Sequence, residues 1–445
     1  MSESDNAEEA ACDGLLEAVL DDGNIAQALK RVVGNRGAPG TDGMSVQELA
    51  EWLPSNIDAL KETIRAGKYR PSPVRRVEIP KPDGGTRSLG VPTAVDRLIQ
   101  QAIAQVLTPI YEPTFSDSSF GFRPNRSAQD AILRAKGYMD EGYRYAVDLD
   151  LSKFFDTLNQ DRLMTEVRKT VRDMRLTDLI KRFVKAGAVL PSGLTVRTDE
   201  GTPQGGPLSP LLANIYLDRF DKLMESRNLH FIRYADDIVV FVRTPRSAER
   251  VMESCIRFLE GNEMRLKVNR DKSSCGSTRG MKILGFELFT RKGDTFVSIH
   301  RKSLKRFKDR IRQITRRNRG RSLGQILAEL RTYMRGWIGY FGIVTSRSMI
   351  EKLDSWIRRR VRQYIWKQWK TFGAKFTNLM GLCPPYYQCP DGRPDENWKL
   401  QCSAIAGSRA YWRISTHITL NRALGNRWLA DQGMYFMMGD CKKTG

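Results

Sequence analysis

Short runs of β-branched and aromatic residues alternate with longer amphipathic stretches between about residues 67 and 293. The short runs predict strands at residues 74–80, 143–149, 231–234, 238–242 and 282–289. The longer stretches, with apolar residues every three or four positions, predict helices at residues 94–107, 128–140, 208–226 and 248–260. This part of the chain is therefore predicted to be a mixed α/β domain.

The pattern changes after about residue 300, where the chain becomes helical and strongly basic. An apolar stripe typical of amphipathic helices includes Ile311, Ile314, Leu323, Ile326, Leu327 and Leu330, and aromatic residues such as Trp337 and Trp366 follow at helical spacing. Residues 301–370 hold 21 Lys or Arg against four Asp or Glu. A long run of one sign interleaved with aromatic side chains indicates nucleic-acid contact, and a solvated cationic helix face is the alternative.

Composition narrows the class of protein further. A chain of 445 residues is too long for one ordinary domain, so we expect two to four. A net charge of +22 and a pI near 9.8 indicate a polyanionic partner. No apolar run approaches the roughly 20 residues that span a bilayer, and the acidic N-terminus does not resemble a secretory signal. The odd number of Cys, seven, without a CxxC pair or a secretory signal favours reduced, intracellular thiols. We expect a cytoplasmic, nucleoid-associated bacterial protein.

Two acidic segments carry the candidate chemistry. Asp150 ends one predicted strand, and Asp236 and Asp237 stand between two others, where we expect a hairpin turn without the usual Gly. Three carboxylates brought together would repel one another, and hard divalent cations with oxygen ligands remove that cost. The alternative is an acidic surface turn together with a helix-capping Asp.

These segments sit in a series of motifs that resembles the group II intron-encoded reverse transcriptase/maturase family. In order they are NRGAPGTDG at 35–43, IPKPDGGTRSLGVP at 79–92, FGFRPNRS at 120–127, GTPQGGPLSPLLANIYL at 201–217, LKVNRDK at 266–272, LGF at 284–286 and RGWIGYF at 335–341. The pairing of PQGG with SPLLAN is the most diagnostic, and the resemblance covers nearly the whole chain.

The resemblance implies an α+β right-hand polymerase fold with a central antiparallel sheet. It divides the chain into an N-terminal extension (1–66) with an acidic start and an RNA-binding segment, fingers and palm (67–300), a helical thumb called maturase domain X (301–370), and a small C-terminal DNA-binding domain (371–445). The tail motif GSRAYWR at 407–413 resembles endonuclease-lacking, group IIC-like members. No HNH-type cassette is recognised, so mobility would need a single-stranded or nicked target.

The resemblance also implies residue roles. Asp150, Asp236 and Asp237, with the Leu151 carbonyl, would hold two Mg²⁺ ions, or Mn²⁺ in their place, and Lys272 would be a general acid near the pyrophosphate. The incoming dNTP would be bound by Lys81, Arg87, Phe155 as the steric gate, and Gln204. Gly285 and Phe286 would form the primer grip. The residues expected to contact RNA or DNA are Arg123, Arg316, Arg317, Arg335, Arg358 and Arg359.

Several assignments have a plainer reading beside them. Phe155 could be an ordinary core aromatic, as we expect for Phe154. Asp148 and Asp156 are predicted to be structural, and exchange of Asp148 for Asp150 is the error to watch for. Gln160 departs from the His of many relatives, without an expected effect on catalysis. Cys383, Cys389 and Cys402 lack CxxC spacing and are predicted to be packing thiols.

The predicted function is RNA-directed DNA polymerisation, with a second role in binding the intron RNA to promote its splicing and retrohoming. The partners implied are group II intron RNA, an RNA template with a DNA or RNA primer, a DNA target and dNTPs; no membrane is expected, and a homodimer is compatible with the sequence. Two alternatives stay open: a domesticated reverse transcriptase in DNA repair or phage defence, and a splicing-only maturase.

Overall fold

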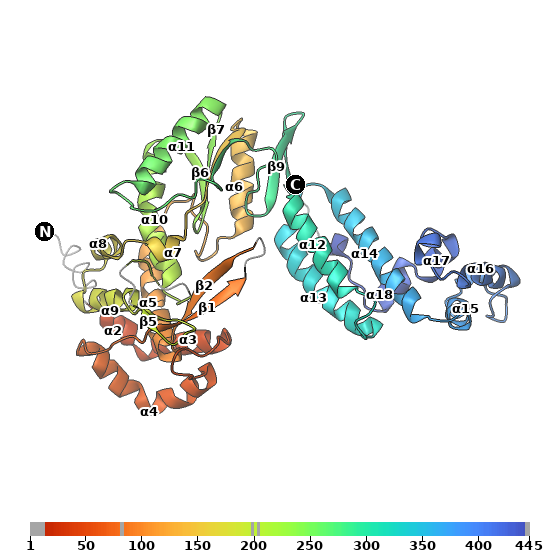
Figure 1. The fold of residues 1–445 in the computed structure, drawn as a ribbon, viewed down its shortest axis with the longest axis horizontal. Helices are drawn as coiled ribbons and strands as arrows, with labels where there is room; N and C mark the ends of the chain where they lie inside the picture. The colour runs from red at the N-terminus through yellow and green to blue at the C-terminus, as the bar shows by residue number, and fades with distance from the viewer. Residues whose placement is uncertain (1–13, 81–83, 197–199, 203–204, 441–445) are drawn as a thin grey trace. The chain divides into compact units, whose positions relative to one another are not determined.

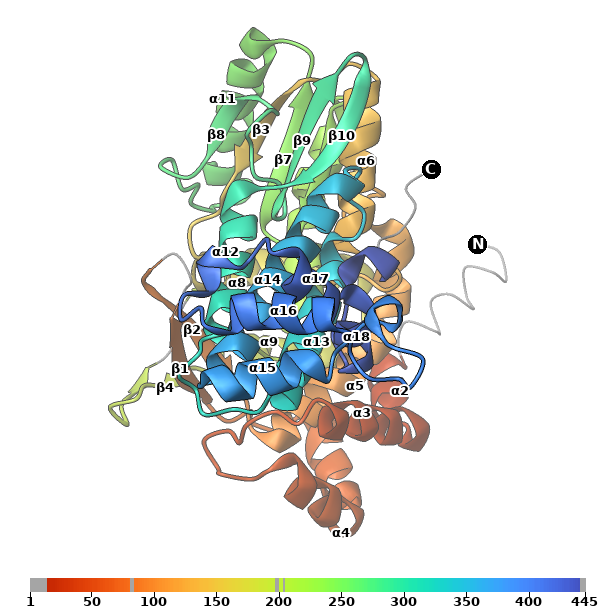
Figure 2. The same cartoon turned by 90° about the vertical axis from the view of Figure 1, so that its right-hand side faces the viewer.

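Three strands predicted near the middle of the chain form one antiparallel sheet with a fourth strand, at residues 274–277, that was not predicted. In this computed structural model, which describes residues 14–80, 84–196, 200–202 and 205–440, the four strands run in the order β6 (His230–Tyr234), β7 (Asp237–Val242), β3 (Tyr145–Leu149) and β8 (Ser274–Ser277). Every neighbouring pair is antiparallel, and Leu149 of β3 is paired with Ile238 of β7 (Figures 1 and 2).

The two faces of this sheet have different environments because side chains alternate along a strand. Val147 and Leu149 share a buried cluster with Ile238 and Val240, where helices α10 (Ser209–Ser226) and α11 (Pro245–Glu260) pack against the sheet. The opposite face carries Phe241, whose ring lies 5.7 Å from that of Tyr138 on helix α6 (Ala128–Asp140). By the same alternation, the side chains of Asp148 and Asp150 lie on the α6 face.

The chain divides into two units, Met1–Ser277 and Thr278–Gly445. Ahead of the central sheet, the first unit contains helices α2 (Leu15–Leu20), α3 (Asp22–Gly34), α4 (Val46–Arg65) and α5 (Ala94–Tyr111) and the 3₁₀ turn η1 (Glu112–Thr114). Between β3 and α10 lie helices α7 (Phe154–Thr157), α8 (Gln160–Thr170) and α9 (Met174–Val184). Several of these helices begin at capping side chains, such as Ser45 before α4 and Thr93 before α5.

A second sheet of the first unit contains the hairpin of β1 (Val74–Pro80) and β2 (Thr86–Val91). Its strand order is β2-β1-β4-β5, with β4 (Ala188–Val189) parallel to β1 and β5 (Thr195–Val196) antiparallel to β4. Gly84 and Gly85 at the hairpin turn both have positive φ, 96° and 78°, which glycine adopts without steric cost.

The second unit is a hairpin followed by helices. Strands β9 (Phe286–Arg291) and β10 (Asp294–Ile299) pair with each other, and helices α12 (Arg301–Ile314), α13 (Leu323–Phe341) and α14 (Arg347–Gln368) follow. Their core includes a close stack of Phe307 on Trp337, with ring centroids 4.0 Å apart. The tail contains α15 (Phe372–Met380), η2 (Pro385–Tyr387), α16 (Glu396–Ala406), η3 (Tyr411–Arg413), α17 (Ile418–Ala423), α18 (Asn426–Asp431) and η4 (Met437–Asp440).

The predicted elements agree with those observed except at one strand. The predicted strand at 282–289 begins only at Phe286 as β9, because Leu284 and Gly285 turn the chain with positive φ values of 48° and 87°. The mixed α+β class is confirmed, while the predicted domain boundaries stay predictions. Within the described ranges, no helix combines the length and apolar character needed to cross a bilayer.

Candidate functional site

The β6–β7 hairpin presents the paired acids. Tyr234 is paired with Asp237, so Ala235 and Asp236 form the turn. Ala235 has φ +58°, a conformation that costs a residue with a side chain roughly 1–2 kcal/mol. Gly121 packs directly against this turn, since a Cβ there would lie 2.1 Å from the Ala235 nitrogen. The turn is therefore held in a strained conformation by its surroundings.

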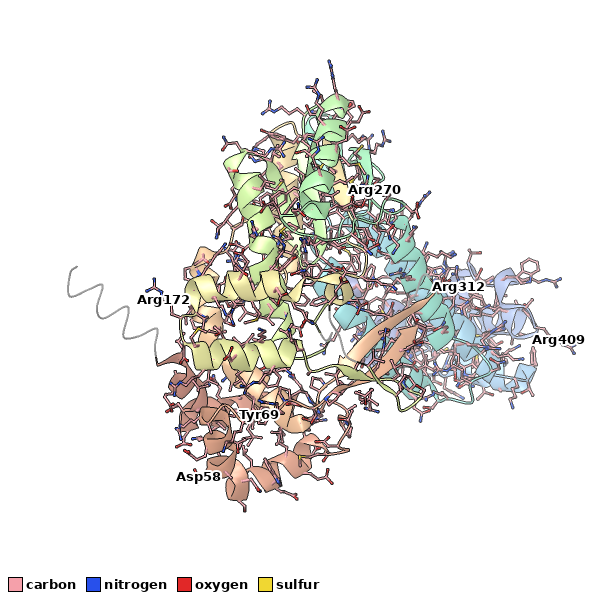
Figure 3. All side chains as sticks on the ribbon, turned by 60° about the vertical axis from the view of Figure 1, so that its left-hand side comes forward. Asp58, Tyr69, Arg172, Arg270, Arg312 and Arg409 are labelled. Carbon is pink, nitrogen blue, oxygen red and sulfur yellow. The ribbon has the colours of Figure 1, made fainter. Side chains whose placement is uncertain are left out.

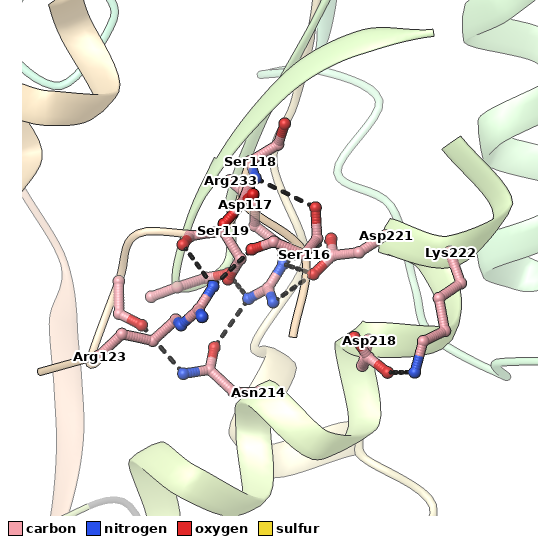
Figure 4. Close-up of polar contacts among 12 residues, drawn as sticks. Ser116, Asp117, Ser118, Ser119, Arg123, Asn214, Asp218, Asp221, Lys222 and Arg233 are labelled. Atoms are coloured by element: carbon pink, nitrogen blue, oxygen red, sulfur yellow. Dashed lines mark hydrogen bonds and ion pairs between the residues drawn. The ribbon is translucent and has the colours of Figure 1, made fainter. Parts of the chain in front are cut away.

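A buried arginine supplies much of that support. The Arg233 guanidinium donates to both carboxylate oxygens of Asp221, to Asn214 Oδ1 at 2.9 Å and to the Ala235 carbonyl at 3.1 Å. Asn214 in turn donates to the Gly121 carbonyl at 2.9 Å, and Arg233 and Asp221 are both fully buried (Figure 4). This network links helix α10 to the turn that carries Asp236.

Asp150 is held at the end of β3 by the segment from residue 267 to 273. Its amide donates to Ser273 Oγ at 3.1 Å, and its carbonyl accepts from the Asn269 amide at 2.8 Å. Because Leu149 is paired with Ile238, the next position in register places Asp150 opposite Asp237. Lys272 Nζ lies 3.8 Å from Asp150 Oδ2.

Asp150 and Asp236 both line one cavity of about 530 Å³ in the first unit. Lys272 and Arg87 line it too, and Leu151 and Asn269 contribute to its wall. A cavity of this size suits a small charged ligand. Asp148 does not line it, so the structure places Asp150, and not its neighbour in the motif, at the candidate site.

The predicted metal ligands do not form a closed cluster. Across the described ranges, no group of three His, Cys, Asp or Glu side chains is close enough to hold a metal ion. Asp236 is half-buried at the cavity, whereas Asp237 is exposed and does not line it. The donor chemistry nevertheless suits a hard divalent cation, because all these side-chain donors are carboxylate oxygens.

The predicted nucleotide-binding residues are only partly described. Lys81 and Gln204 lie outside the described residues. Arg87 is exposed on β2. Phe155 is 5% exposed and lines a smaller cavity of about 230 Å³ whose wall shares Arg76, Ser88, Lys153 and Asp156 with the larger one. Phe154 is buried and meets Phe155 edge-on, as expected of a core aromatic.

Two cations at these cavities were missed from the sequence. Arg76 and Lys153 line both of them. Arg76 donates to Ser88 Oγ at 2.9 Å across the β1–β2 hairpin. The sequence held a signal for Arg76: it is two positions from Glu78, so both side chains project from the same face of β1, and both line the larger cavity.

The predicted primer-grip residues belong to the second unit. Gly285 has φ +87°, and its carbonyl accepts hydrogen bonds from the His300 amide and from Ser303 Oγ. Phe286 is fully buried against Tyr340 and Phe341. Only the backbone of this turn is therefore available to a bound primer.

Arg123 is a correction to the predicted nucleic-acid contacts. Its side chain is 2% exposed and forms an ion pair with Glu112 at 2.8 Å. It also donates to the carbonyls of Ser119 at 2.9 Å and of Ser116 (Figure 4). With its donors used inside the protein, Arg123 is placed as a structural residue.

The other predicted arginines lie on the second unit. Arg316, Arg317, Arg335 and Arg359 are exposed, as are Arg312 and Arg409, which project from the ribbon in Figure 3. Arg358 is half-buried and donates to Asn426 and Ser355, so less of it is available to a ligand.

Among the described residues of the tail, the three cysteines belong to no group that could hold a metal ion. Cys402 is buried, and burial raises the pKa of its thiol to about 12. Cys383 Sγ donates to the Tyr387 carbonyl at 3.3 Å, and Cys389 is exposed. All three are free thiols.

Comparison with known proteins gives two domain matches. Residues 79–288 match the model of the reverse transcriptase (RNA-dependent DNA polymerase) family, and residues 304–381 match that of the group II intron, maturase-specific domain. Protein YkfC of Escherichia coli (strain K12) is 33% identical over 309 residues, covering 60% of this chain and 81% of YkfC.

The group II intron-encoded protein LtrA of Lactococcus lactis subsp. cremoris is 36% identical over 238 residues, or 53% of this chain and 39% of LtrA. The chain thus aligns with well under half of that relative. Among solved structures, a chain of a partial Cas6-RT-Cas1–Cas2 complex covers 55% of this chain and 42% of its own, at 23% identity and a TM-score of 0.35. This structural similarity is low.

Proposed function

The chain belongs to the family of group II intron-encoded reverse transcriptases and maturases, and from this premise we propose how its own residues serve the two family activities. The first activity is RNA-directed DNA synthesis, in which deoxynucleotides are added to a primer 3′ end on an RNA template. The second is maturase function, in which the protein binds the intron RNA and promotes splicing.

One observation carries the polymerase assignment: Asp150, just past the end of β3, and Asp236, in the β6–β7 turn, line the same cavity. Extending the β3–β7 register by one residue would place Asp237 opposite Asp150. In this proposal the three carboxylates and the Leu151 carbonyl hold two Mg²⁺ ions, or Mn²⁺ in their place. When bound, such a pair activates the attacking hydroxyl and stabilises the leaving oxygen.

Lys272 has a defined place in this proposal. Its ammonium lies 3.8 Å from Asp150 Oδ2 and is largely exposed on the cavity wall. From there it attracts the phosphates of a dNTP and can donate a proton to the departing pyrophosphate. The pair also reduces the charge repulsion among the carboxylates.

The dNTP would occupy the 530 Å³ cavity between the β1–β2 hairpin and the strand ends. Arg87 and Lys81 would bind its triphosphate, with Arg supplying forked contacts. Phe155, at the wall of the adjoining cavity, would exclude a 2′-hydroxyl by its bulk. Gln204 would line the nucleotide pocket.

The finer architecture follows the same premise. We assign the sheet and the β1–β2 hairpin to the palm and fingers of a right-hand polymerase, α12 to α14 to the thumb, and the tail to a small DNA-binding domain. Gly285 and Phe286 would support the primer through the backbone. Exposed arginines such as Arg316, Arg317 and Arg335 would contact RNA phosphates.

Primer extension on an RNA template tests the polymerase assignment. Asp236→Ala should reduce extension by at least about 100-fold, because loss of this carboxylate weakens metal binding. Asp58→Ala, which removes an exposed acid from α4 (Figure 3), should extend like the parent. Equal extension by Asp236→Ala and the parent would refute the site.

Splicing of the intron RNA separates the second activity from the first. Asp236→Ala should still promote splicing, because the maturase-specific match begins at residue 304, outside the unit that carries the acids. Loss of splicing in this variant, with unchanged thermal unfolding, would argue against separate sites.

A further inference from the structure

A cavity of about 390 Å³ lies in the second unit and includes none of the residues assigned above to metal or dNTP binding. It is formed by the loop after α12, the end of α14, helix α15 and the loop before η3. Of its nine lining residues, five are Lys or Arg, three are aromatic and none is acidic. Such a combination suits a ligand that is both anionic and flat.

The floor of the cavity is buried and ordered by hydrogen bonds. Trp366 is 3% exposed, and its Nε1 donates to the Ser408 carbonyl at 3.1 Å. Lys375 is 5% exposed, donates to the same carbonyl at 2.9 Å and lies 4.9 Å from the centre of the Trp366 ring. The aromatic surface and the ammonium are thus fixed in place.

Among the described residues, the floor holds one ammonium without a paired carboxylate and one hydroxyl without a hydrogen-bond partner. Within the described ranges no carboxylate pairs with Lys375, and burial together with Arg409 lowers the pKa of its ammonium. The Tyr411 side chain is 8% exposed, and its buried hydroxyl has no hydrogen-bond partner among the described residues. A buried charge without a counter-charge is costly, and a bound anion would remove this cost.

The rim adds the remaining charge. Arg317, Lys367, Lys370 and Arg409 are exposed around the opening. Trp369 is half-buried, with its ring 6.0 Å from that of Trp366. The half-buried Trp369 side chain is therefore partly accessible for stacking, and the exposed cations line the same cavity.

We propose that this cavity binds one unpaired nucleotide of the intron RNA, with its base against the tryptophans and its phosphates at the basic rim. The inference rests on the RNA binding proposed above and names the feature that is recognised. Proteins recognise RNA sequence mainly at unpaired bases, which stack on aromatic side chains. Seven of the nine lining residues fall in the maturase-specific match, which favours RNA over other polyanions.

The test compares the affinity of the full-length protein for three probes: a short single-stranded RNA, a duplex RNA of equal charge and the single-stranded DNA of the same sequence. Trp369→Ala should lower the affinity for single-stranded RNA about tenfold, the scale of one lost base stack, and leave the affinity for duplex RNA unchanged. Trp412→Ala is the matched control, since Trp412 is 72% exposed nearby and does not line the cavity.

Each outcome decides the matter. Unchanged single-stranded RNA binding in Trp369→Ala, or an equal loss for duplex RNA, overturns the pocket. A greater loss for DNA than for RNA overturns the RNA assignment. If the parent protein binds no RNA at all, the proposed maturase function fails instead. Primer extension should be unchanged in both variants, which would confirm that the fold and the polymerase site remain intact.

Discussion

At the residue scale, the structure separates side chains that the motifs present as equivalent. Asp148 and Asp150 both belong to the same acidic motif and project from the same face of the sheet, yet only Asp150 lines the cavity. The reason is position along the strand: Asp148 is still paired inside the sheet, opposite Val239 and Ser274, whereas Asp150 lies just past the end of β3. An acidic side chain of this motif reaches the cavity only past the end of the strand.

The contrast between Arg123 and Arg316 can be measured. Arg123→Ala should lower the free energy of unfolding by about 3 kcal/mol, because Glu112 and several buried carbonyls lose their donor. Arg316→Ala should change it by less than about 0.5 kcal/mol but weaken RNA binding. Urea unfolding and RNA affinity, measured on both variants, check this. A stable Arg123→Ala with weakened RNA binding would restore Arg123 as a contact.

At the scale of elements, the β6–β7 hairpin depends on helix α10. The strained Ala235 turn is held by Arg233, and Arg233 is held by Asp221 and Asn214 of α10. The helix thus acts on Asp236 without touching the cavity itself. The buried Asp221 and Asn214 are explained by this support, since an apolar helix face would leave the buried Arg233 guanidinium without its counter-charge.

Asp221→Asn tests this support. Removing the charge that pairs with buried Arg233 should lower the free energy of unfolding by about 3 kcal/mol. RNA-templated extension by the folded variant should fall by about 10- to 100-fold, the cost of a small misplacement in an active site. Chemical unfolding and extension per folded molecule are the measurements.

Asp218, one turn away on the same helix, provides the control. Its side chain is 12% exposed and pairs with Lys222, whose side chain is 57% exposed (Figure 4). Because it accepts no hydrogen bond from Arg233 among the described residues, Asp218→Asn should cost less stability than Asp221→Asn and leave extension close to that of the parent. Full activity in Asp221→Asn, or an equal loss in Asp218→Asn, would show that the network does not position the turn.

At the scale of the molecule, the acids of the candidate site and the long run of basic residues lie in different units. The acids of the candidate site lie in Met1–Ser277, while the 21 basic residues of 301–370 lie in Thr278–Gly445. The helices of the second unit bury apolar and aromatic side chains such as Phe307 and Trp337 and leave many arginines exposed. A surface of this kind binds nucleic acid mainly through phosphates.

Salt dependence measures that mode of binding. If six or more phosphates are neutralised, affinity for intron RNA should fall on the order of 10³-fold between about 50 and about 200 mM salt, because binding releases counterions. Replacing Arg316 and Arg317 by Gln should flatten the slope of log affinity against log salt. A slope near zero in the parent would show that these charges do not contact phosphates.

The sequence by itself determined the elements and the chemistry. Runs of β-branched and aromatic residues located β3, β6 and β7, the helical period located the basic helices, and the motifs with their family resemblance led to the prediction of Asp150, Asp236 and Asp237 as the acids. These features are local, since each depends on residues within a few positions of one another, so periodicity and residue type suffice to predict them.

Only the tertiary structure decided which side chains share a space. It placed Asp236 and Asp150 at one cavity, buried Arg123 against Glu112, connected Arg233 to α10, and gathered Lys375, Trp366 and Tyr411 around another cavity. These arrangements join residues far apart in the chain. They depend on how sheets and helices pack, because burial and pairing of a charge are properties of its neighbours in space.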